Sequence, residues 1–216
     1  MSKLVPTILV DNRENFDIYL KTYTTFADEI QIDICDGFFV PTKTISLSEI
    51  PILPEHISFD FHMMVTKPSD YLTEILRIKP SLCIFHAECN ENLLPIFQQL
   101  KSSGIKTGVA ILKETFPGKI KPYLDVVDHI LVFAGKLGQQ GGEADMLQTE
   151  KIPIIKNINS TLEIGWDGGV NMQNIRALAH NEVDIINVGS ALSQSQNPSE
   201  TYKSLVDESD KTGVLF

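Results

Sequence analysis

The feature that most limits the possible folds of this chain is a regular alternation of short β-rich runs with longer segments of helical period. Runs rich in Val, Ile, Phe and Thr are predicted to be strands because β-branched and aromatic residues suit a pleated, largely buried surface. Eight such runs are predicted, at Leu4–Val10, Glu29–Ile34, Ile57–Val65, Leu82–Glu88, Lys106–Leu112, Asp128–Ala134, Thr161–Asp167 and Asp184–Ser190.

The segments between these runs have room for helices, and several begin with a capping residue or an early proline. Helices are predicted at Arg13–Ala27, Ser69–Ile78, Glu91–Ser103, Glu143–Asn157 and Asn171–Asn181, with a last one after Asn197. Glu143–Asn157 has the weakest helical pattern because Pro153 interrupts it. Eight strand–helix units without a linker or a composition shift favour one (β/α)8 TIM barrel, a single domain over residues 1–216, rather than an open doubly wound sheet.

The charge and composition of the chain narrow the class of ligand. A formal net charge of −10 disfavours a nucleic-acid or anionic membrane surface, since both would repel the protein, and a small-molecule substrate is expected instead. The start, MSKLVPTILV, is too soon broken by Pro6 for a secretory signal, and no apolar run approaches membrane-spanning length, so a cytoplasmic location is expected. Three cysteines without a CxxC pair predict reduced thiols.

Polar residues on the predicted strands are expected to gather at one mouth of the barrel. In such a barrel, inward positions near the carboxyl ends of the strands form the active site, whereas outward positions pack on helices. On the second strand, EIQIDIC, Gln31 and Asp33 share one face and three isoleucines share the other. The same alternation places His62 of the third strand beside Asp33, and the seventh strand ends at Asp167. Carboxylates and an imidazole thus stand where branched aliphatic residues normally fill a barrel.

Other polar or apolar residues near the strand ends have simpler interpretations. Asp36-Gly37 is expected to be the turn that ends the second strand. His86 and Glu88 share a face of the fourth strand and are expected to support the site through hydrogen bonds rather than to act in it. Three further residues are core by default, with an apolar wall around a substrate as the alternative: Cys35, Met64 and Phe133.

Glycine-rich segments follow the last three predicted strands, as KLGQQGG, DGGVN and VGSA. Barrel enzymes commonly hold phosphate in the loops after strands seven and eight, through backbone N–H groups and a helix start rather than through salt bridges. Such a site suits an acidic chain. Lys136 is either an additional charge at this site or a solvated loop residue.

Several motifs in consecutive order resemble the ribulose-phosphate 3-epimerase family over almost the whole chain. They are PTILV, IQIDICDGFFVPT, FHMMVTKPSDYL, IFHAE, GVAILKET, EIGWDGGVN and NVGSA. The resemblance implies a barrel enzyme that epimerises the carbon next to the carbonyl group of a ketose phosphate. It also implies two catalytic aspartates and one divalent metal ion as cofactor: Zn²⁺, Fe²⁺, Mn²⁺ or Co²⁺.

By position, the resemblance implies that Asp33 and Asp167 are the acid–base pair and that both bind the metal together with His62. His62 is also expected to contact the substrate, as is Thr7, which stands where the family has a serine. The implied phosphate site comprises Gly138, Gly141, Gly168, Gly169, Gly189 and Ser190. Asp60, two residues before His62 on the same face, is expected to orient the imidazole.

Two departures from the family pattern concern the metal and the phosphate. Gln31 stands where the family has a histidine ligand, and an amide oxygen is a poorer ligand for zinc or iron(II) than imidazole. With Gln31 as the fourth ligand, we expect weaker metal binding or a preference for a harder ion. The loop Lys136–Gly141 lacks the proline-glycine-aromatic-glycine-glycine pattern of the family, which puts its closure over phosphate in question.

The predicted reaction is the interconversion of D-ribulose 5-phosphate and D-xylulose 5-phosphate, a pentose phosphate step of carbohydrate metabolism. Inversion next to a carbonyl needs proton removal on one face and delivery on the other, which two carboxylates can perform. One alternative is a phosphosugar-binding protein that has lost turnover, suggested by Gln31. Another is a phosphosugar lyase or decarboxylase, disfavoured because FDFHMMV lacks the lysine that such barrels pair with aspartate. Homo-oligomers through the helices are compatible with this fold.

Overall fold

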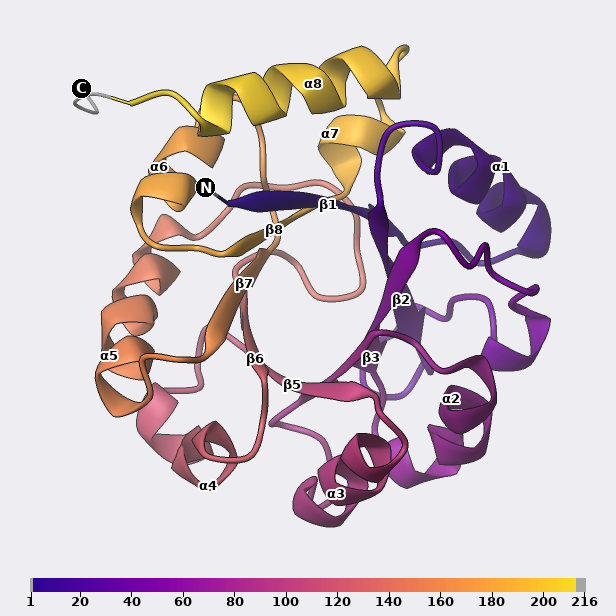
Figure 1. Ribbon diagram of the computed structural model, residues 1–216, viewed down its shortest axis with the longest axis vertical. Coiled ribbons are helices and arrows are strands. Elements are labelled where there is room, and N and C mark those ends of the chain that lie inside the picture. Colours follow the sequence, from indigo (N-terminus) through magenta and orange to yellow (C-terminus); the bar gives the residue numbers. More distant parts are fainter. Residues whose placement is uncertain (1, 213–216) are drawn as a thin grey trace.

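Each of the eight β-rich runs forms a strand, and the strands pair in parallel and in chain order to close a barrel (Figure 1). The structure is a computed structural model that describes residues 2–212. The strands are β1 (Lys3–Ile8), β2 (Glu29–Cys35), β3 (Ser58–Met64), β4 (Leu82–His86), β5 (Lys106–Ile111), β6 (His129–Phe133), β7 (Glu163–Asp167) and β8 (Ile185–Val188). The predicted (β/α)8 barrel is therefore confirmed.

Helices surround the barrel on its outside, and most are shorter than predicted. The α-helices are α1 (Arg13–Tyr23), α2 (Leu72–Ile78), α3 (Leu94–Ser102), α4 (Lys121–Leu124), α5 (Lys151–Ile158), α6 (Ile175–His180), α7 (Ser190–Ser193) and α8 (Pro198–Ser209). Short 3₁₀ helices are η1 (Leu47–Glu49), η2 (Pro68–Tyr71), η3 (Pro117–Ile120) and η4 (Met146–Glu150). None of the helices between residues 2 and 212 is long and apolar enough to cross a membrane.

Four predicted helices begin later as α-helices than predicted. The segment predicted from Ser69 begins as η2 and continues as α2 from Leu72. The helix predicted from Glu91 begins at Leu94, whose backbone N–H donates to Oδ1 of Asn92 (3.1 Å), while the Glu91 carboxylate accepts hydrogen bonds from the backbone N–H (2.8 Å) and hydroxyl (2.6 Å) of Ser69. The helix predicted over 143–157 divides into η4 and α5, so Pro153 lies in the first turn of α5, where a missing N–H costs little. The helix predicted from Asn171 begins only at Ile175, because a turn precedes α6.

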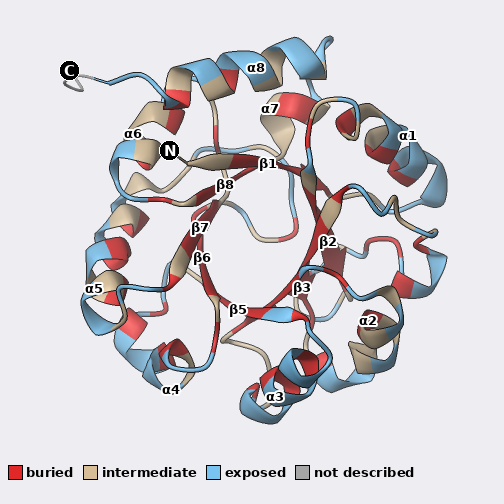
Figure 2. Ribbon diagram, in the orientation of Figure 1, coloured by how far each residue is buried: buried red, intermediate tan, exposed pale blue. Residues whose placement is uncertain are grey.

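The apolar core lies mainly between the strands and the helical shell (Figure 2). The three isoleucines of β2 are at most 2% exposed and belong to this layer, as the alternation predicts: Ile30, Ile32 and Ile34. A second, smaller aliphatic cluster comes from β4, β5 and β6: Leu82, Ile84, Ala110 and Leu131. The outward faces of the strands thus provide most of the packing, which leaves inward positions at one mouth free for polar residues.

The strand register brings the inward polar residues to a common level. Asp33 pairs with His62 across β2 and β3, and Asp167 pairs with Phe133 on one side and Asn187 on the other. The turn predicted at Asp36 is confirmed, since its carboxylate accepts hydrogen bonds from the backbone N–H groups of the two residues after Gly37. The register therefore assembles one ring of polar side chains at the carboxyl ends of the strands.

Candidate active site

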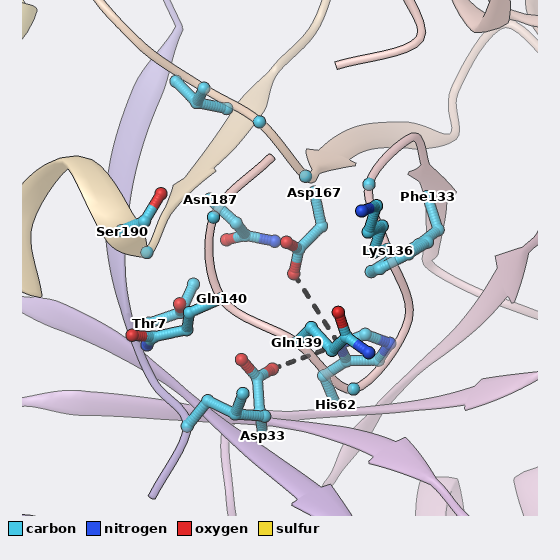
Figure 3. Close-up of a pocket in the computed structure, with 18 of the residues that line it drawn as sticks. Thr7, Asp33, His62, Phe133, Lys136, Gln139, Gln140, Asp167, Asn187 and Ser190 are labelled. Carbon is cyan, nitrogen blue, oxygen red and sulfur yellow. Dashed lines mark hydrogen bonds and ion pairs between the residues drawn. The ribbon is translucent and has the colours of Figure 1, made fainter. Parts of the chain in front are cut away.

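A pocket opens at the carboxyl ends of the strands, and side chains from opposite sides of the barrel point into it (Figure 3). All the predicted catalytic and substrate-binding residues line this pocket: Thr7, Asp33, His62, Gly138, Gly141, Asp167, Gly168, Gly169, Gly189 and Ser190. Met64 and Phe133 line it as well, which favours the apolar-wall interpretation for both. Lys136 also lines the pocket, although it is exposed to solvent.

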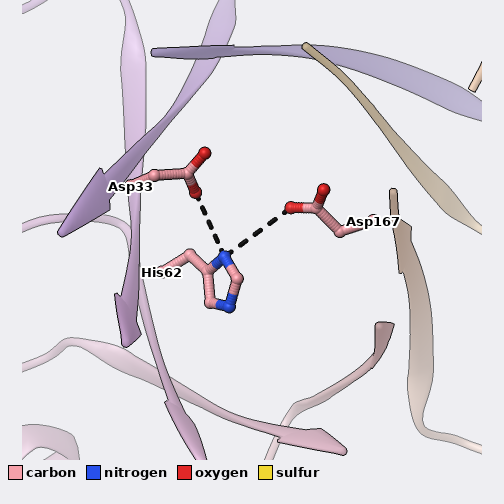
Figure 4. Close-up of side chains that lie close together, drawn as sticks. All are labelled: Asp33, His62 and Asp167. Atoms are coloured by element: carbon pink, nitrogen blue, oxygen red, sulfur yellow. Dashed lines mark hydrogen bonds and ion pairs between the residues drawn. The ribbon is translucent and has the colours of Figure 1, made fainter. Parts of the chain in front are cut away.

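Two carboxylates face the same imidazole nitrogen (Figure 4). The Nδ1 atom of His62 lies 3.1 Å from Oδ1 of Asp33 and 3.6 Å from Oδ2 of Asp167. One ligand atom from each of these three residues lies within 4.8 Å of the others, a spacing at which a single ion can reach all three. Two carboxylate oxygens and one imidazole nitrogen suit a divalent transition metal, so the donor set fits the ion that the family resemblance implies.

Gln31 lies beneath this cluster and links the two acids as a hydrogen-bond donor. Its Nε2 atom donates to Oδ1 of Asp33 (2.9 Å) and to Oδ2 of Asp167 (2.7 Å). Its oxygen, the atom that could bind a metal, accepts a hydrogen bond from Nδ2 of Asn187 (2.8 Å). Gln31 therefore presents the nitrogen end of its amide to the acids, and the amide would have to turn over for the predicted ligand role.

His86 holds the other side of the His62 ring. The two Nε2 atoms are 2.8 Å apart, and Nδ1 of His86 faces Oε2 of Glu88 at 3.5 Å. Burial and, to a smaller extent, the charge of His62 lower the pKa of His86 to about 4, so this ring is neutral. With its proton on Nδ1 toward Glu88, His86 accepts from Nε2–H of His62, which directs Nδ1 of His62 at the two acids.

The role predicted for Asp60 is wrong, and His86 takes it. Asp60 contacts Glu29, one layer deeper in the barrel, while both nitrogens of His62 have other partners. The register explains this, because Asp60 pairs with Gln31 rather than with Asp33 across β2 and β3. The interpretation of His86 as a hydrogen-bonded support agrees with the structure.

The acids and the imidazole perturb one another's proton affinity. Burial, followed by the charge of Asp33, raises the pKa of Asp167 to about 7, although the charge of His62 and the hydrogen bond from Gln31 oppose the rise. Burial lowers the pKa of His62, but its hydrogen bond to Asp33 and the charges of both acids outweigh burial and raise it overall. A carboxyl group that is half protonated near neutral pH can both donate and accept a proton.

The glycine-rich loops form the rest of the pocket. Gly168 has φ 114°, and a Cβ atom there would collide with the backbone of Gly135, so the loops after β6 and β7 touch along their main chains. Both glycines line the pocket, so main-chain atoms without side chains border the mouth there, and backbone N–H groups of such loops can donate to an anion.

A segment of the loop after β6, Lys136–Gly141, crosses the mouth and is called the crossing loop below. The Thr42 hydroxyl donates to the Gly138 carbonyl (2.6 Å), and the Ser193 hydroxyl donates to Oε1 of Gln140 (2.8 Å). Thr42 follows β2, and Ser193 ends α7. The altered sequence of this loop thus still allows it to span the pocket from one side to the other.

Six residues that line the pocket were not among the predicted site residues: Leu9, Gly135, Gln139, Gln140, Val170 and Asn187. The alternation in β8 contains the signal for Asn187, because Asn187 and Gly189 share one face of DIINVGS. Leu9 likewise shares the parity of Thr7 in PTILV, whereas loop conformation determines the other four positions, which have no periodic pattern in the sequence.

Comparison with known proteins agrees with this site and fold. The family model described as the ribulose-phosphate 3 epimerase family matches residues 3–193. A ribulose-phosphate 3-epimerase of Schizosaccharomyces pombe is 26% identical over 211 residues, 94% of this chain and 92% of that protein. The cytoplasmic isoform of ribulose-phosphate 3-epimerase from Oryza sativa subsp. japonica is 30% identical over 185 residues, 83% of this chain and 81% of that protein.

Solved structures share the barrel at lower sequence identity. The 3-hexulose-6-phosphate synthase of Salmonella typhimurium superposes with a TM-score of 0.73 at 14% identity, over 96% of this chain and 98% of that chain. Such a likeness establishes the architecture alone. The family match, in contrast, includes all eight strands and every residue that lines the pocket. The chain belongs to the ribulose-phosphate 3-epimerase family.

Proposed function

We propose that the protein is a metal-dependent 3-epimerase that interconverts D-ribulose 5-phosphate and D-xylulose 5-phosphate in the cytoplasm. The observation that carries the proposal is the pair of carboxylates, Asp33 and Asp167, which converge on Nδ1 of His62 inside one pocket. The curated relatives with the ribulose-phosphate 3-epimerase name support this choice of substrate.

The proton transfers follow from the positions of the two acids. Asp33 comes from β2 and Asp167 from β7, so a substrate carbon between them has one carboxylate on each face. In one direction Asp33 removes the C3 proton, and Asp167 in its protonated form delivers a proton to the opposite face. In the reverse direction the two acids exchange roles. The carbon is inverted without net consumption of a proton.

The intermediate of this reaction is an enediolate, whose negative charge needs stabilisation where it develops. A divalent ion held by Asp33, His62 and Asp167 would supply that stabilisation as a Lewis acid. His62 is directed at this position by its contact with His86. Gln31 is not assigned as a ligand because its NH₂ group faces the acids.

The phosphate group of the substrate is assigned to the glycine-rich side of the pocket. Gly168, Gly169, Gly189 and Ser190 provide main-chain N–H groups there, and the crossing loop covers them. An acidic protein can bind a phosphate in this way with few cationic side chains. Lys136 is the one lysine among the residues that line this pocket.

Incubation with D-ribulose 5-phosphate in D₂O, with Mn²⁺, Zn²⁺, Fe²⁺ or Co²⁺ added, tests the proposal. We expect deuterium at C3 and formation of D-xylulose 5-phosphate, both followed by NMR. Asp33→Asn and Asp167→Asn should each lower the rate by about 10²-fold or more, since each removes one proton-transfer group. Tight phosphosugar binding without any exchange, together with a gain of exchange in Gln31→His, would instead identify a binding protein that has lost turnover.

A further inference from the structure

We propose that Asn187 is a positioning residue that locks the Gln31 amide as a donor to both acids, and that Gln31 thereby competes with a divalent ion instead of binding it. This inference rests on the proposed function, because it concerns the metal assigned there. It adds that the ion has three side-chain ligands, Asp33, His62 and Asp167, with Gln31 outside its coordination sphere.

Gln31 and Asn187 form a buried pair of amides. Gln31 is 1% exposed and Asn187 is 3% exposed, so neither amide can exchange its partner for bulk water. The Asn187 NH₂ group donates to the Gln31 oxygen at 2.8 Å. Because an amide has a donor end and an acceptor end, this bond directs the Gln31 NH₂ group to the opposite side, toward the acids.

Gln31 contacts the two carboxylate oxygens that an ion at this site would use. The Gln31 NH₂ group donates to Oδ1 of Asp33 and Oδ2 of Asp167, at 2.9 and 2.7 Å. These are the same two oxygens that face Nδ1 of His62. An ion between the three side chains would therefore use atoms that already accept hydrogen bonds, and the partial positive charge of the NH₂ group would repel it.

The opposite orientation of the Gln31 amide is unfavourable because of Asn187. If Gln31 turned its oxygen to the acids, its NH₂ group would meet the NH₂ group of Asn187, donor against donor. Both amides would have to turn together, because a pair with only one amide turned would leave two buried NH₂ groups facing each other without an acceptor between them. Asn187 thus acts on the metal site through Gln31. An apolar residue at position 187 would remove this constraint.

Titration of the metal-free protein with Mn²⁺ at pH 8, followed by the EPR signal of the free ion, tests the competition. We expect Gln31→Leu to raise Mn²⁺ affinity about 10-fold, and Asn187→Leu to raise it less, since hydrogen bonds to charged groups are lost or weakened. The double variant should bind no more tightly than Gln31→Leu alone. Gln148→Leu removes a buried amide that donates to Asp145 outside the pocket, and should leave the affinity unchanged.

Two results would overturn the inference. Weaker Mn²⁺ binding in Gln31→Leu would make Gln31 a ligand, and additive effects of the two substitutions would show that Asn187 does not act through Gln31.

A second measurement separates this inference from the proposed function. In the metal-free protein, NMR should show the Gln31 side-chain NH₂ protons protected from exchange, with at least 10-fold faster exchange in Asn187→Leu. If the wild type binds no Mn²⁺ while these protons are protected, the metal of the proposed function fails and the amide lock stands. If Mn²⁺ binds but the protons are unprotected, or their exchange is unchanged in Asn187→Leu, the lock fails.

Discussion

Replacement of Asp167 by asparagine is expected to stabilise the metal-free protein at neutral pH, although it removes a carboxylate of the proposed active site. Burial and the charge of Asp33 raise the pKa of this carboxyl from 3.8 to about 7 in the folded protein. Between these pH values the folded protein keeps a proton that the unfolded chain releases, so the carboxyl destabilises the fold increasingly as pH rises. Asparagine has nearly the same shape, carries no charge and can still accept the hydrogen bond from Gln31.

The magnitude follows from the interval between the two pKa values. The pKa rises from 3.8 to about 7, an interval of roughly 3 pH units. Each unit corresponds to about 1.36 kcal/mol in the free energy of unfolding. The increase in the free energy of unfolding on Asp167→Asn should therefore be near zero below pH 3.8 and approach about 4 kcal/mol above pH 7. For a domain of this size, that corresponds to a rise in Tm of roughly 8–16 °C. The Asp167 side chain is 15% exposed, and its contact with water makes about 4 kcal/mol, with the corresponding rise in Tm, an upper limit.

Thermal unfolding between pH 4.5 and 8.5 in the presence of a chelator measures the effect. The difference in Tm between Asp167→Asn and the wild type should widen as pH rises and level off above about pH 7. Asp125→Asn, at the exposed end of α4, is the matched control and should show no such widening. Added Mn²⁺ should raise the Tm of the wild type above that of Asp167→Asn, because the ion binds the folded wild type more tightly than the folded variant. A lower Tm for Asp167→Asn at pH 8 in chelator, or a difference independent of pH, would refute the reasoning.

Three further outcomes are expected. Asp60→Asn should raise Tm at pH 7 but not at pH 3 in melting curves, because burial raises the pKa of Asp60 in the folded protein. Gly138→Ala should raise KM for D-ribulose 5-phosphate at least several-fold in steady-state assays, since Gly138 has φ 70° and a Cβ atom would lie 2.8 Å from Val40. Ser193→Ala, which removes the hydrogen bond to Gln140, should raise KM a few-fold with kcat within about twofold; an unchanged KM would contradict a role for this contact in binding.

The alternation of strand and helix segments predicted the barrel. Strand parity then placed His62 beside Asp33, and the common mouth of a barrel brought Asp167, at the end of the seventh strand, to the same region. Amide orientation was not predictable in this way. Alternation places Gln31 on the inward face, but the direction of its amide depends on Asn187, which is 156 residues away in the sequence. Similarly, α7 spans only four residues and is too short to show a helical period.

The two hydrogen bonds of the crossing loop have a consequence for the timing of turnover. Since Thr42 and Ser193 already fix this loop at both sides of the mouth, a ligand need not order it on binding, and affinity benefits from this preorganisation. The same fixation opposes movement of the loop away from the mouth, because one attachment must open before that side of the loop can move. Entry of substrate and release of product, rather than proton transfer, are then the steps that these two side chains affect.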